Sequence, residues 1–199
     1  MFHTLTNKRG FTLTELLVAM ALSAVVMAAI GYVYYTQQKS YLVQDQLAAA
    51  QQNLRAGMYF MEREIRMAGY DPTQNASPTP GIGTAGTNTI AFTSDLNGDR
   101  DTVDTNESVT YSLGDNDGDG DTDLLRNGNV IAENIDTLNF VYLDGASPPN
   151  VLDDDGSGNV TTNIPNIRSV QVTVVAKTGR ADQGYTRRKQ LDTTIKLRN

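Results

Sequence analysis

The first third of the chain carries two hydrophobic patterns in succession. Residues 16–38 contain no charged side chain and are mostly apolar through Tyr35. As a helix, about 20 apolar residues span about 30 Å, the thickness of a bilayer's hydrocarbon core. From residue 47 apolar side chains recur at spacings of three or four, as in an amphipathic helix: Leu47, Ala50, Leu54, Met58, Met61, Ile65 and Ala68. Together the patterns predict a single helix from Leu13 to Ala68, ended by Gly69 and Pro72.

The rest of the chain carries the short alternating patterns that are typical of strands. Residues 71–88 are rich in Pro, Gly, Ser and Thr and predict a flexible loop. Strands are expected at residues 89–93, 108–113, 124–126, 130–132, 135–143, 169–177 and 191–197. The connection 178–190 is long enough for a mobile loop. This order predicts an α+β fold, in which one long N-terminal helix packs on an antiparallel β-sheet head.

In three of these strands apolar and polar side chains alternate, which identifies candidate core residues. On one face lie Leu138, Phe140 and Tyr142 of the fifth strand, Val170, Val172 and Val174 of the sixth, and Leu191, Thr193, Ile195 and Leu197 of the last. Asn127-Gly128-Asn129 is typical of a hairpin turn. Gly81-Ile-Gly83-Thr-Ala-Gly86 matches the spacing of a dinucleotide-binding loop, but no strand precedes it and no helix follows it. We therefore interpret it as part of the flexible loop.

Composition argues against catalysis. The chain of 199 residues is long enough for one domain or at most two, and it has no cysteine and a single histidine, His3. Thiolate nucleophiles and cysteine-based zinc or iron–sulfur sites are excluded. An imidazole base beyond residue 3 is excluded as well. We predict that the protein is not an enzyme and has no organic cofactor.

The net charge of −7 is unevenly distributed along the chain. Residues 71–165 hold seventeen acidic and two basic side chains, a charge of −15, whereas residues 166–199 carry +6. The acidic middle would repel phosphates, so we expect no nucleic-acid partner.

Three charged residues lie at the start of the apolar N-terminal segment. Lys8 and Arg9 precede it, which keeps residues 1–10 cytoplasmic and places the chain after Tyr35 outside. Glu15 interrupts the apolar pattern, and a carboxylate in hydrocarbon costs at least ~2 kcal/mol on insertion scales. Glu15 must therefore be partnered or functional.

The run from Lys8 to Val18 resembles the class III signal of type IV prepilins and pseudopilins. It has a short basic leader, Gly10 before the cut, Phe11 after it, Glu15 as the fifth mature residue, and then an unbroken apolar helix. The resemblance implies cleavage between Gly10 and Phe11 by a prepilin peptidase, and N-methylation of Phe11. An uncleaved signal anchor, or a secretory signal cut after Ala29-Ile30-Gly31, would not explain Glu15.

This resemblance suggests four regions: a leader at 1–10, a transmembrane or filament-core helix at 11–35, its amphipathic continuation at 36–70, and a β-rich head with acidic loops at 71–199. The helix end, Leu54-Arg55 and then Met61 to Tyr70, resembles PilW-type minor pilins and J-type pseudopilins. We interpret its charges as surface ion pairs three or four residues apart.

The resemblance implies a minor structural subunit of a type IV pilus. Its expected partners are other pilin or minor pilin subunits, the prepilin peptidase and the inner-membrane assembly platform. It would span the bacterial inner membrane once, with its head in the periplasm, and then reach the pilus or cell surface. Glu15 is expected to pair with the N-terminal amine of an adjoining subunit. The main alternative is a J-type pseudopilin of a type II secretion system.

Three acidic loops resemble the first half of an EF-hand calcium loop, which predicts Ca²⁺ as a cofactor. The first presents Asp115, Asp117, Asp119, Asp121 and Asp123, with Gly120 at position 6 but Arg126 at position 12. The second presents Asp153, Asp155 and Ser157, with Ile164 at position 12. The third presents Asp95, Asn97, Asp99 and Asp101, with Arg100 in place of the glycine.

Two other interpretations of the acidic loops remain open. Asp, Asn and Gly are common in solvated turns, where they need no ion. If the loops do bind calcium, the chain could instead be a membrane-anchored calcium-dependent binding module or adhesin that keeps its leader. A carboxylate enzyme is disfavoured, because paired acid and base carboxylates need different environments on rigid elements.

Overall fold

The computed structural model describes residues 10–118, 120–178 and 187–198. The chain divides into two compact units, residues 1–45 and 46–199. Helix α1 (Leu13–Ile65) is followed by nine strands and one short 3₁₀ turn, η1 (Ile164–Asn166), among these residues. The predicted α+β class, one long N-terminal helix followed by antiparallel sheet, is confirmed.

The first unit contains the apolar half of α1. All residues from 10 to 42 are exposed, and α1 is long and apolar enough to cross a membrane. Two hydroxyls in this half bond within the helix, Ser23 Oγ to the Ala19 carbonyl at 2.7 Å and Thr36 Oγ1 to the Tyr32 carbonyl at 2.9 Å. The segment therefore presents apolar side chains and few unsatisfied polar groups to its surroundings.

The second unit begins with the amphipathic half of α1, and its predicted stripe is confirmed. Ala50, Leu54, Met58, Met61 and Ile65 are buried, and Ala68 just beyond the helix is buried too. Gly57 also lies on this face, where a Cβ atom would sit 2.9 Å from Leu124 and 3.5 Å from Ala132. The absence of a side chain at residue 57 lets the helix approach the strands closely.

The helix ends at Ile65, three residues earlier than the predicted Ala68. The amides of Met67 and Ala68 bond only three residues back, to Glu64 and Ile65, so the chain tightens out of α-helical geometry. Gly69 has a φ of 78°, and its amide donates to the carbonyl of Thr93 at 3.0 Å. The helix is thus terminated by bonding to a strand.

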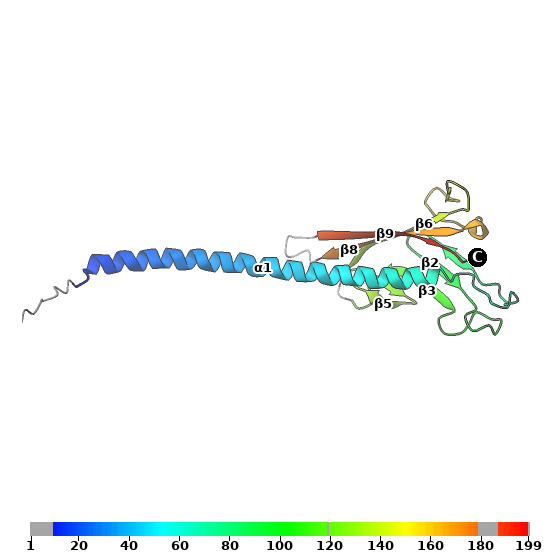
Figure 1. Cartoon of the computed structure of the whole chain (residues 1–199), viewed down its shortest axis with the longest axis horizontal. Coiled ribbons are helices and arrows are strands. Elements are labelled where there is room, and N and C mark those ends of the chain that lie inside the picture. Colours follow the sequence, from blue (N-terminus) through cyan, green and yellow to red (C-terminus); the bar gives the residue numbers. More distant parts are fainter. Residues whose placement is uncertain (1–9, 119, 179–186, 199) are drawn as a thin grey trace, which may run out of the picture. The chain divides into compact units, whose positions relative to one another are not determined.

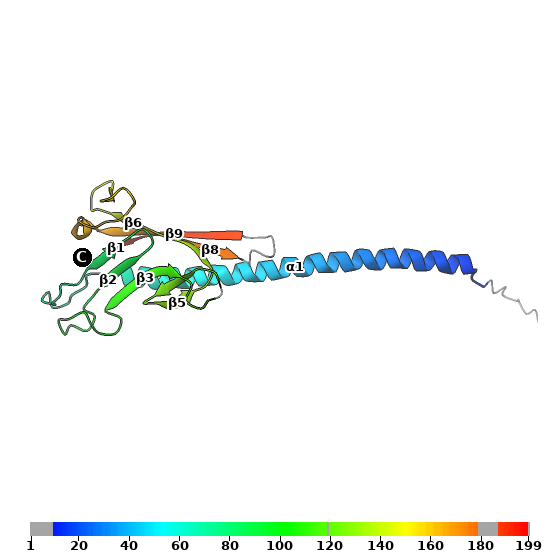
Figure 2. The same cartoon turned by 180° about the vertical axis from the view of Figure 1, so that it is seen from behind.

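The strands form two antiparallel sheets instead of the single predicted sheet. The first has the order β1-β2-β3-β4-β5 and consists of β1 (Ile82–Ala85), β2 (Ile90–Thr93), β3 (Ser108–Gly114), β4 (Asp123–Arg126) and β5 (Asn129–Ala132). The second has the order β7-β6-β8-β9 and consists of β7 (Val151–Leu152), β6 (Ile135–Leu143), β8 (Ser169–Thr178) and β9 (Arg187–Lys196). In Figures 1 and 2, β8 and β9 lie on one side of the C-terminal part of α1 and β5 on the other.

The predicted core faces are confirmed. Leu138, Phe140 and Tyr142 of β6 are buried, as are Val170, Val172 and Val174 of β8. In β9 Ile195 is buried, and Leu191 packs against the same core. One hydrophobic cluster joins these residues to the buried face of α1, so helix and sheets share a single core.

Two predicted loops were partly wrong. Residues 82–85 form β1, which pairs with β2 through a register shift between Ile82 and Thr84, and Ala85 forms a bridge with Val160. Strand β9 already begins at Arg187, opposite Thr178, so the predicted loop 178–190 is shorter, and residues 179–186 lie outside the described residues. Strand β7 was not predicted at all. The segment around β1 is glycine-rich, the start of β9 is polar, and β7 is very short. Backbone pairing forms these strands although their apolar and polar side chains do not clearly alternate.

The charges at the end of α1 are not all surface pairs. Glu62 and Arg66 do form an exposed pair at 2.7 Å. Glu64 instead accepts hydrogen bonds from Arg126 Nε at 2.9 Å and from the Tyr111 hydroxyl at 2.6 Å, so it links the helix to the first sheet. Burial, and then the bond to Glu64, raises the pKa of Tyr111 above its usual range, so the hydroxyl stays a donor.

Filling the space at Gly57 tests the close packing of α1. Gly57→Val should lower the free energy of unfolding by about 1–3 kcal/mol, because its methyl groups would overlap the buried Leu124 side chain. The measurement is thermal unfolding of the full chain in detergent, followed by near-ultraviolet circular dichroism of the buried tyrosines. Gly31→Val is the control, since a Cβ at Gly31 meets nothing within 4 Å. Equal melting temperatures for both variants would contradict the packing.

Candidate functional site

The candidate processing site lies just before α1. Gly10 and Phe11 are not helical, and Phe11 is 91% exposed. A Cβ at Gly10 would meet nothing within 4 Å, so nothing in the described chain requires glycine there. The Gly10–Phe11 bond is therefore open to a protease, and any need for glycine would come from the protease cleft.

Glu15 forms a capping box at the first turn of α1. The amide and the hydroxyl of Thr12 donate to Glu15 Oε2 at 2.9 and 2.8 Å, and the Glu15 amide donates to Thr12 Oγ1 at 3.3 Å. Thr12 is thus the N-cap and Glu15 the N3 residue. Our sequence reasoning missed Thr12, although Thr-x-x-Glu before an apolar run is the signal of such a box. Both hydrogen bonds from Thr12 to the Glu15 carboxylate end on Oε2. Oε1 is left for a hydrogen-bond donor on another molecule.

The first acidic loop does not gather its carboxylates among the described residues. Asp115 accepts the amides of Gly118 and Gly120 at 2.8 and 3.1 Å. Asp121 lies 3.5 Å from Lys177 Nζ, and the buried Asp123 in β4 accepts the amide of Asn134 at 2.9 Å. Asp117 is exposed, and Asp119 lies outside the described residues. Asp115 thus holds the backbone of its own loop, whereas Asp121 and Asp123 bond to Lys177 and Asn134 outside it, and calcium binding here stays a prediction.

The second acidic loop is also closed by its own hydrogen bonds. Asp153 accepts the amide of Gly156 at 2.7 Å, and Asp155 accepts the amide and hydroxyl of Ser157 at 2.8 and 2.6 Å. Asp154 accepts three successive amides, those of residues 161, 162 and 163. The bonds from Asn163 above all keep the pKa of Asp154 below its usual range, and those from Ser157 do so for Asp155.

The third loop connects β2 to β3, and its first two predicted ligands act as braces. Asp95 is fully buried, and its two oxygens accept the amides of Gly98 and Arg100 at 2.6 and 3.1 Å. Asn97 Nδ2 donates to Asp99 Oδ2 at 2.9 Å and to Asp104 Oδ2 at 2.8 Å. Asn97 therefore draws together two carboxylates that are five residues apart.

Four carboxylates converge in this third loop. One oxygen from each of Asp99, Asp101, Asp104 and Glu107 lies within 4.8 Å of the other three. A shared hydrogen bond with Asp99, and then the charges of Asp99, Asp101 and Glu107, raise the pKa of Asp104. Among the described residues this is the one such group of three or more possible metal ligands. The sequence prediction stopped at Asp101 and missed Asp104 and Glu107.

Glu107 is the buried member of this carboxylate cluster, with 1% of its surface exposed. Its Oε1 accepts the amides of Leu96 and Asn97 at 2.8 and 3.4 Å. Its Oε2 is buried and has no hydrogen-bond partner within the described chain. A buried carboxylate oxygen without a partner is costly, and a cation could satisfy it.

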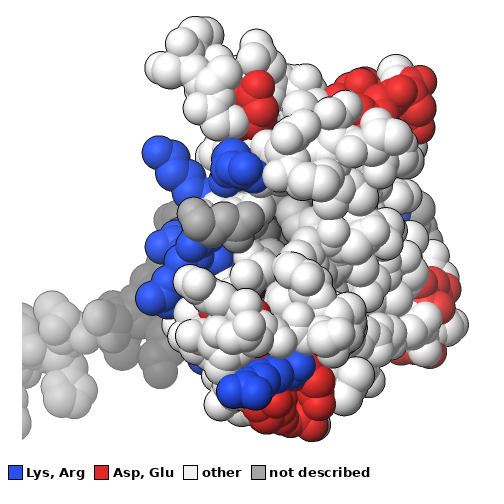
Figure 3. Space-filling view, turned by 90° about the vertical axis from the view of Figure 1, so that its right-hand side faces the viewer, with Lys and Arg blue, Asp and Glu red and all other residues white. Residues whose placement is uncertain are grey.

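The acidic side chains are not spread evenly over the second unit. Figure 3 shows them in several separate patches on one face, while Lys and Arg gather mainly toward another side of it. On this face the acidic side chains therefore form no single continuous negative surface.

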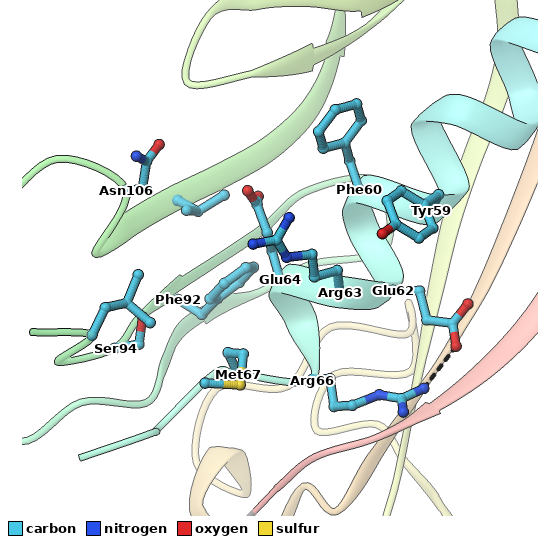
Figure 4. A pocket seen from close by; sticks show the side chains of 12 residues that line it. Tyr59, Phe60, Glu62, Arg63, Glu64, Arg66, Met67, Phe92, Ser94 and Asn106 are labelled. Atoms are coloured by element: carbon cyan, nitrogen blue, oxygen red, sulfur yellow. Dashed lines mark hydrogen bonds and ion pairs between the residues drawn. The ribbon is translucent and has the colours of Figure 1, made fainter. Parts of the chain in front are cut away.

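A groove of about 750 Å³ lies beside the last turns of α1. Figure 4 shows Tyr59 and Phe60 of α1 on one side, and Phe92 of β2 with Met67, just beyond the helix, on the other. Tyr59 and Phe60 are 63% and 44% exposed and meet edge to face. Two carboxylates in the lining are already engaged, Glu62 with Arg66 and Glu64 with Arg126. The groove thus offers an apolar contact surface with a charged rim.

Comparisons with known proteins bear on the N-terminus alone. The family model for the prokaryotic N-terminal methylation motif matches residues 5–31. No curated protein and no solved structure matches the chain. The motif confirms the predicted prepilin-type signal, and together with the fold it supports a type IV pilin-like or pseudopilin-like protein. The assignment to PilW-type or J-type proteins stays a prediction.

The hydrogen bonds that Asp154 accepts predict that the second acidic loop contributes less to the protein's stability in acid. Because these bonds lower the folded-state pKa, the stability they provide is complete above the unfolded-state pKa of about 3.9 and is lost as pH falls toward the folded pKa. Asp154→Asn should therefore melt at a lower temperature than the wild type at neutral pH, and the difference should shrink from about pH 5 to about pH 2. The exposed Glu133→Gln variant serves as control. A difference that stays constant with pH would contradict the assignment.

Proposed function

We propose that this protein is a minor pilin, a structural subunit of a type IV pilus that assembles through α1. Cleavage between Gly10 and Phe11 and N-methylation of Phe11 would precede assembly. The observation that carries the proposal is the prepilin-type motif at residues 5–31, directly joined to a helix half whose apolar side chains are all exposed. Such a surface needs an apolar environment that the described chain does not supply.

Two apolar environments would cover this helix in turn. Before assembly, the helix spans the inner membrane, with Lys8 and Arg9 on the cytoplasmic side and the β-rich unit in the periplasm. After cleavage removes the basic pair, the same surface packs against the equivalent helices of other subunits in a filament core. Because lipid and helix surfaces are similarly apolar, moving between them costs little hydrophobic free energy. The assembly platform would move the subunit between the two.

Glu15 would fix the position of the subunit in the filament. Cleavage gives Phe11 a positively charged amine, and the amine of an adjoining subunit is the natural partner of a carboxylate in an apolar core. Within one subunit, the capping box with Thr12 holds Oε2 of Glu15 and leaves Oε1 for this amine. A buried ion pair that loses one partner typically costs about 3–5 kcal/mol, so a misplaced subunit would be strongly disfavoured.

The proposed role is assembly and requires no catalysis and no nucleic acid. The sequence has no Cys, and its one His precedes the proposed cleavage point. The −15 charge of residues 71–165 would repel phosphates. These features favour a surface that contacts proteins or the outside medium.

Two other functions make different predictions. A J-type pseudopilin would use the same helix and the same Glu15 contact, but it would be needed for protein secretion and be absent from sheared pili. A membrane-anchored calcium-dependent binding module would keep its leader. The minor-pilin proposal is favoured over the binding module by the match of the motif, which includes the leader end and the helix start.

Substitution of Gly10 tests processing. In Gly10→Val cells, the protein should remain a full-length precursor in the membrane and be lost from sheared pili, because a branched side chain would block a cleft that fits glycine. Gly31→Val is a matched control, since both glycines are exposed and neither would clash within the chain. Normal cleavage of Gly10→Val, seen by mass spectrometry of the mature N-terminus, would rule out the class III signal.

Substitution of Glu15 tests its charge separately from its capping role. Glu15→Gln keeps a residue that can form the capping box but removes the charge, whereas Thr12→Ala removes the N-cap side chain and keeps the charge. We expect Glu15→Gln to be processed normally but to reach sheared pili at least about tenfold less, because the amine loses its partner. Thr12→Ala should assemble nearly as the wild type does. The pairing role is refuted if Glu15→Gln assembles normally.

A further inference from the structure

We propose that the β2–β3 loop binds one calcium ion through the carboxylates of Asp99, Asp101, Asp104 and Glu107. This site adds a ligand to the proposed pilin and does not depend on its assembly. Two of the four residues, Asp104 and Glu107, lie outside the EF-hand-like pattern of the sequence.

The first support is the geometry of the cluster. Calcium takes oxygen ligands at about 2.3–2.6 Å, so two oxygens on one ion can be no more than about 5 Å apart. The four carboxylate oxygens all lie within 4.8 Å of one another and meet this limit. They come from residues spread over nine positions, which the loop between β2 and β3 brings together.

The second support is the state of Glu107. Its side chain is 99% removed from solvent, and Oε2 has no partner among the described residues, although the carboxylate reaches the cluster. Two backbone amides hold Oε1 and so fix the position of the group. Glu107 is thus a buried carboxylate that two amides fix in place, that has one unpaired oxygen and that has an oxygen within 4.8 Å of those of three more carboxylates. A cation would stabilise this arrangement.

Hydrogen bonds within the β2–β3 loop hold the carboxylates of the cluster close together despite their mutual repulsion. Asp95, buried beneath the loop, binds two backbone amides and is therefore a positioning residue rather than a ligand. Asn97 donates to both Asp99 and Asp104, and it positions their carboxylates in the same way. In the proposed site Asp95 and Asn97 therefore brace the ligands, whereas the sequence predicted them as ligands.

The chemistry of the ligands favours calcium over other common ions. The cluster offers only oxygen, the preference of hard cations, and no imidazole or thiolate for zinc. Three members are at least partly exposed, so water can complete a coordination of six to eight oxygens. Magnesium demands stricter octahedral geometry and dehydrates reluctantly, so it should bind more weakly.

The test is calcium titration of the purified full chain in detergent by isothermal calorimetry. We expect one calcium ion per chain at this loop, in the range of about 10⁻⁴–10⁻³ M that is typical of extracellular modules. Asp104→Asn should weaken this binding at least tenfold, because it removes a ligand charge. Asp99→Asn should act in the same direction. The exposed Glu133→Gln, which lies in none of the three acidic loops, is the control for loss of one acidic charge and should bind as the wild type does. Asp115→Asn, from the first acidic loop, locates the ion and should leave binding at the β2–β3 loop unchanged.

Thermal unfolding of the same proteins gives an independent readout. In EDTA, Asp104→Asn should melt at or above the wild-type temperature, because one repulsive charge is gone. In millimolar calcium the order should reverse, since only the wild type gains from the ion. The proposal is overturned if calcium neither binds nor raises the wild-type melting temperature. It is equally overturned if Asp115→Asn loses the calcium effect while Asp104→Asn keeps it, because the ion would then lie in the other loop.

Discussion

The structure depends above all on an apolar helix surface that must not face water. Residues 10–42 are exposed throughout, and from residue 16 to residue 35 they are almost entirely apolar. Full burial of one large apolar side chain contributes about 1.5–3 kcal/mol, so this surface has a strong tendency to be covered. In the proposed function a bilayer would cover it first, and other helices of the same kind would cover it later. The proposed function follows from this constraint together with the prepilin-type motif.

Glu15 is the one charged residue between residues 10 and 38, and in the proposed function it would give the contacts of this apolar surface specificity. Hydrophobic contact alone is non-directional and would let helices slide past one another. A single carboxylate, held at the first turn by Thr12, would in the proposed assembly favour those positions in which it meets a positive group. The amphipathic half of α1 then joins the two sheets in one core, with Gly57 allowing close contact and Glu64 bonding to Arg126 and Tyr111.

Sequence patterns predicted the parts of the fold that hydrophobic periodicity determines. The buried stripe of α1 and the alternating faces of β6 and β8 are as expected. Strand β1 was missed because Gly83 and the shifted register give no alternation of apolar and polar residues. The start of β9 was missed because residues 187–190 are polar and pair through their backbone at a sheet edge. The prepilin signal was readable since it is local. The carboxylate cluster was only half predicted, because the fold brings Asp104 and Glu107 back onto Asp99.

The most direct test of the central claim is the chemical identity of the mature N-terminus. Mass spectrometry should be applied to the protein from the membrane fraction and from sheared filaments. A pilin-type subunit should begin with N-methylated Phe11 in both fractions, with Glu15 as its fifth residue. A full-length chain would contradict pilin-type processing because it lacks the free Phe11 amine, and a chain cut after Gly31 would contradict it because it lacks both Phe11 and Glu15.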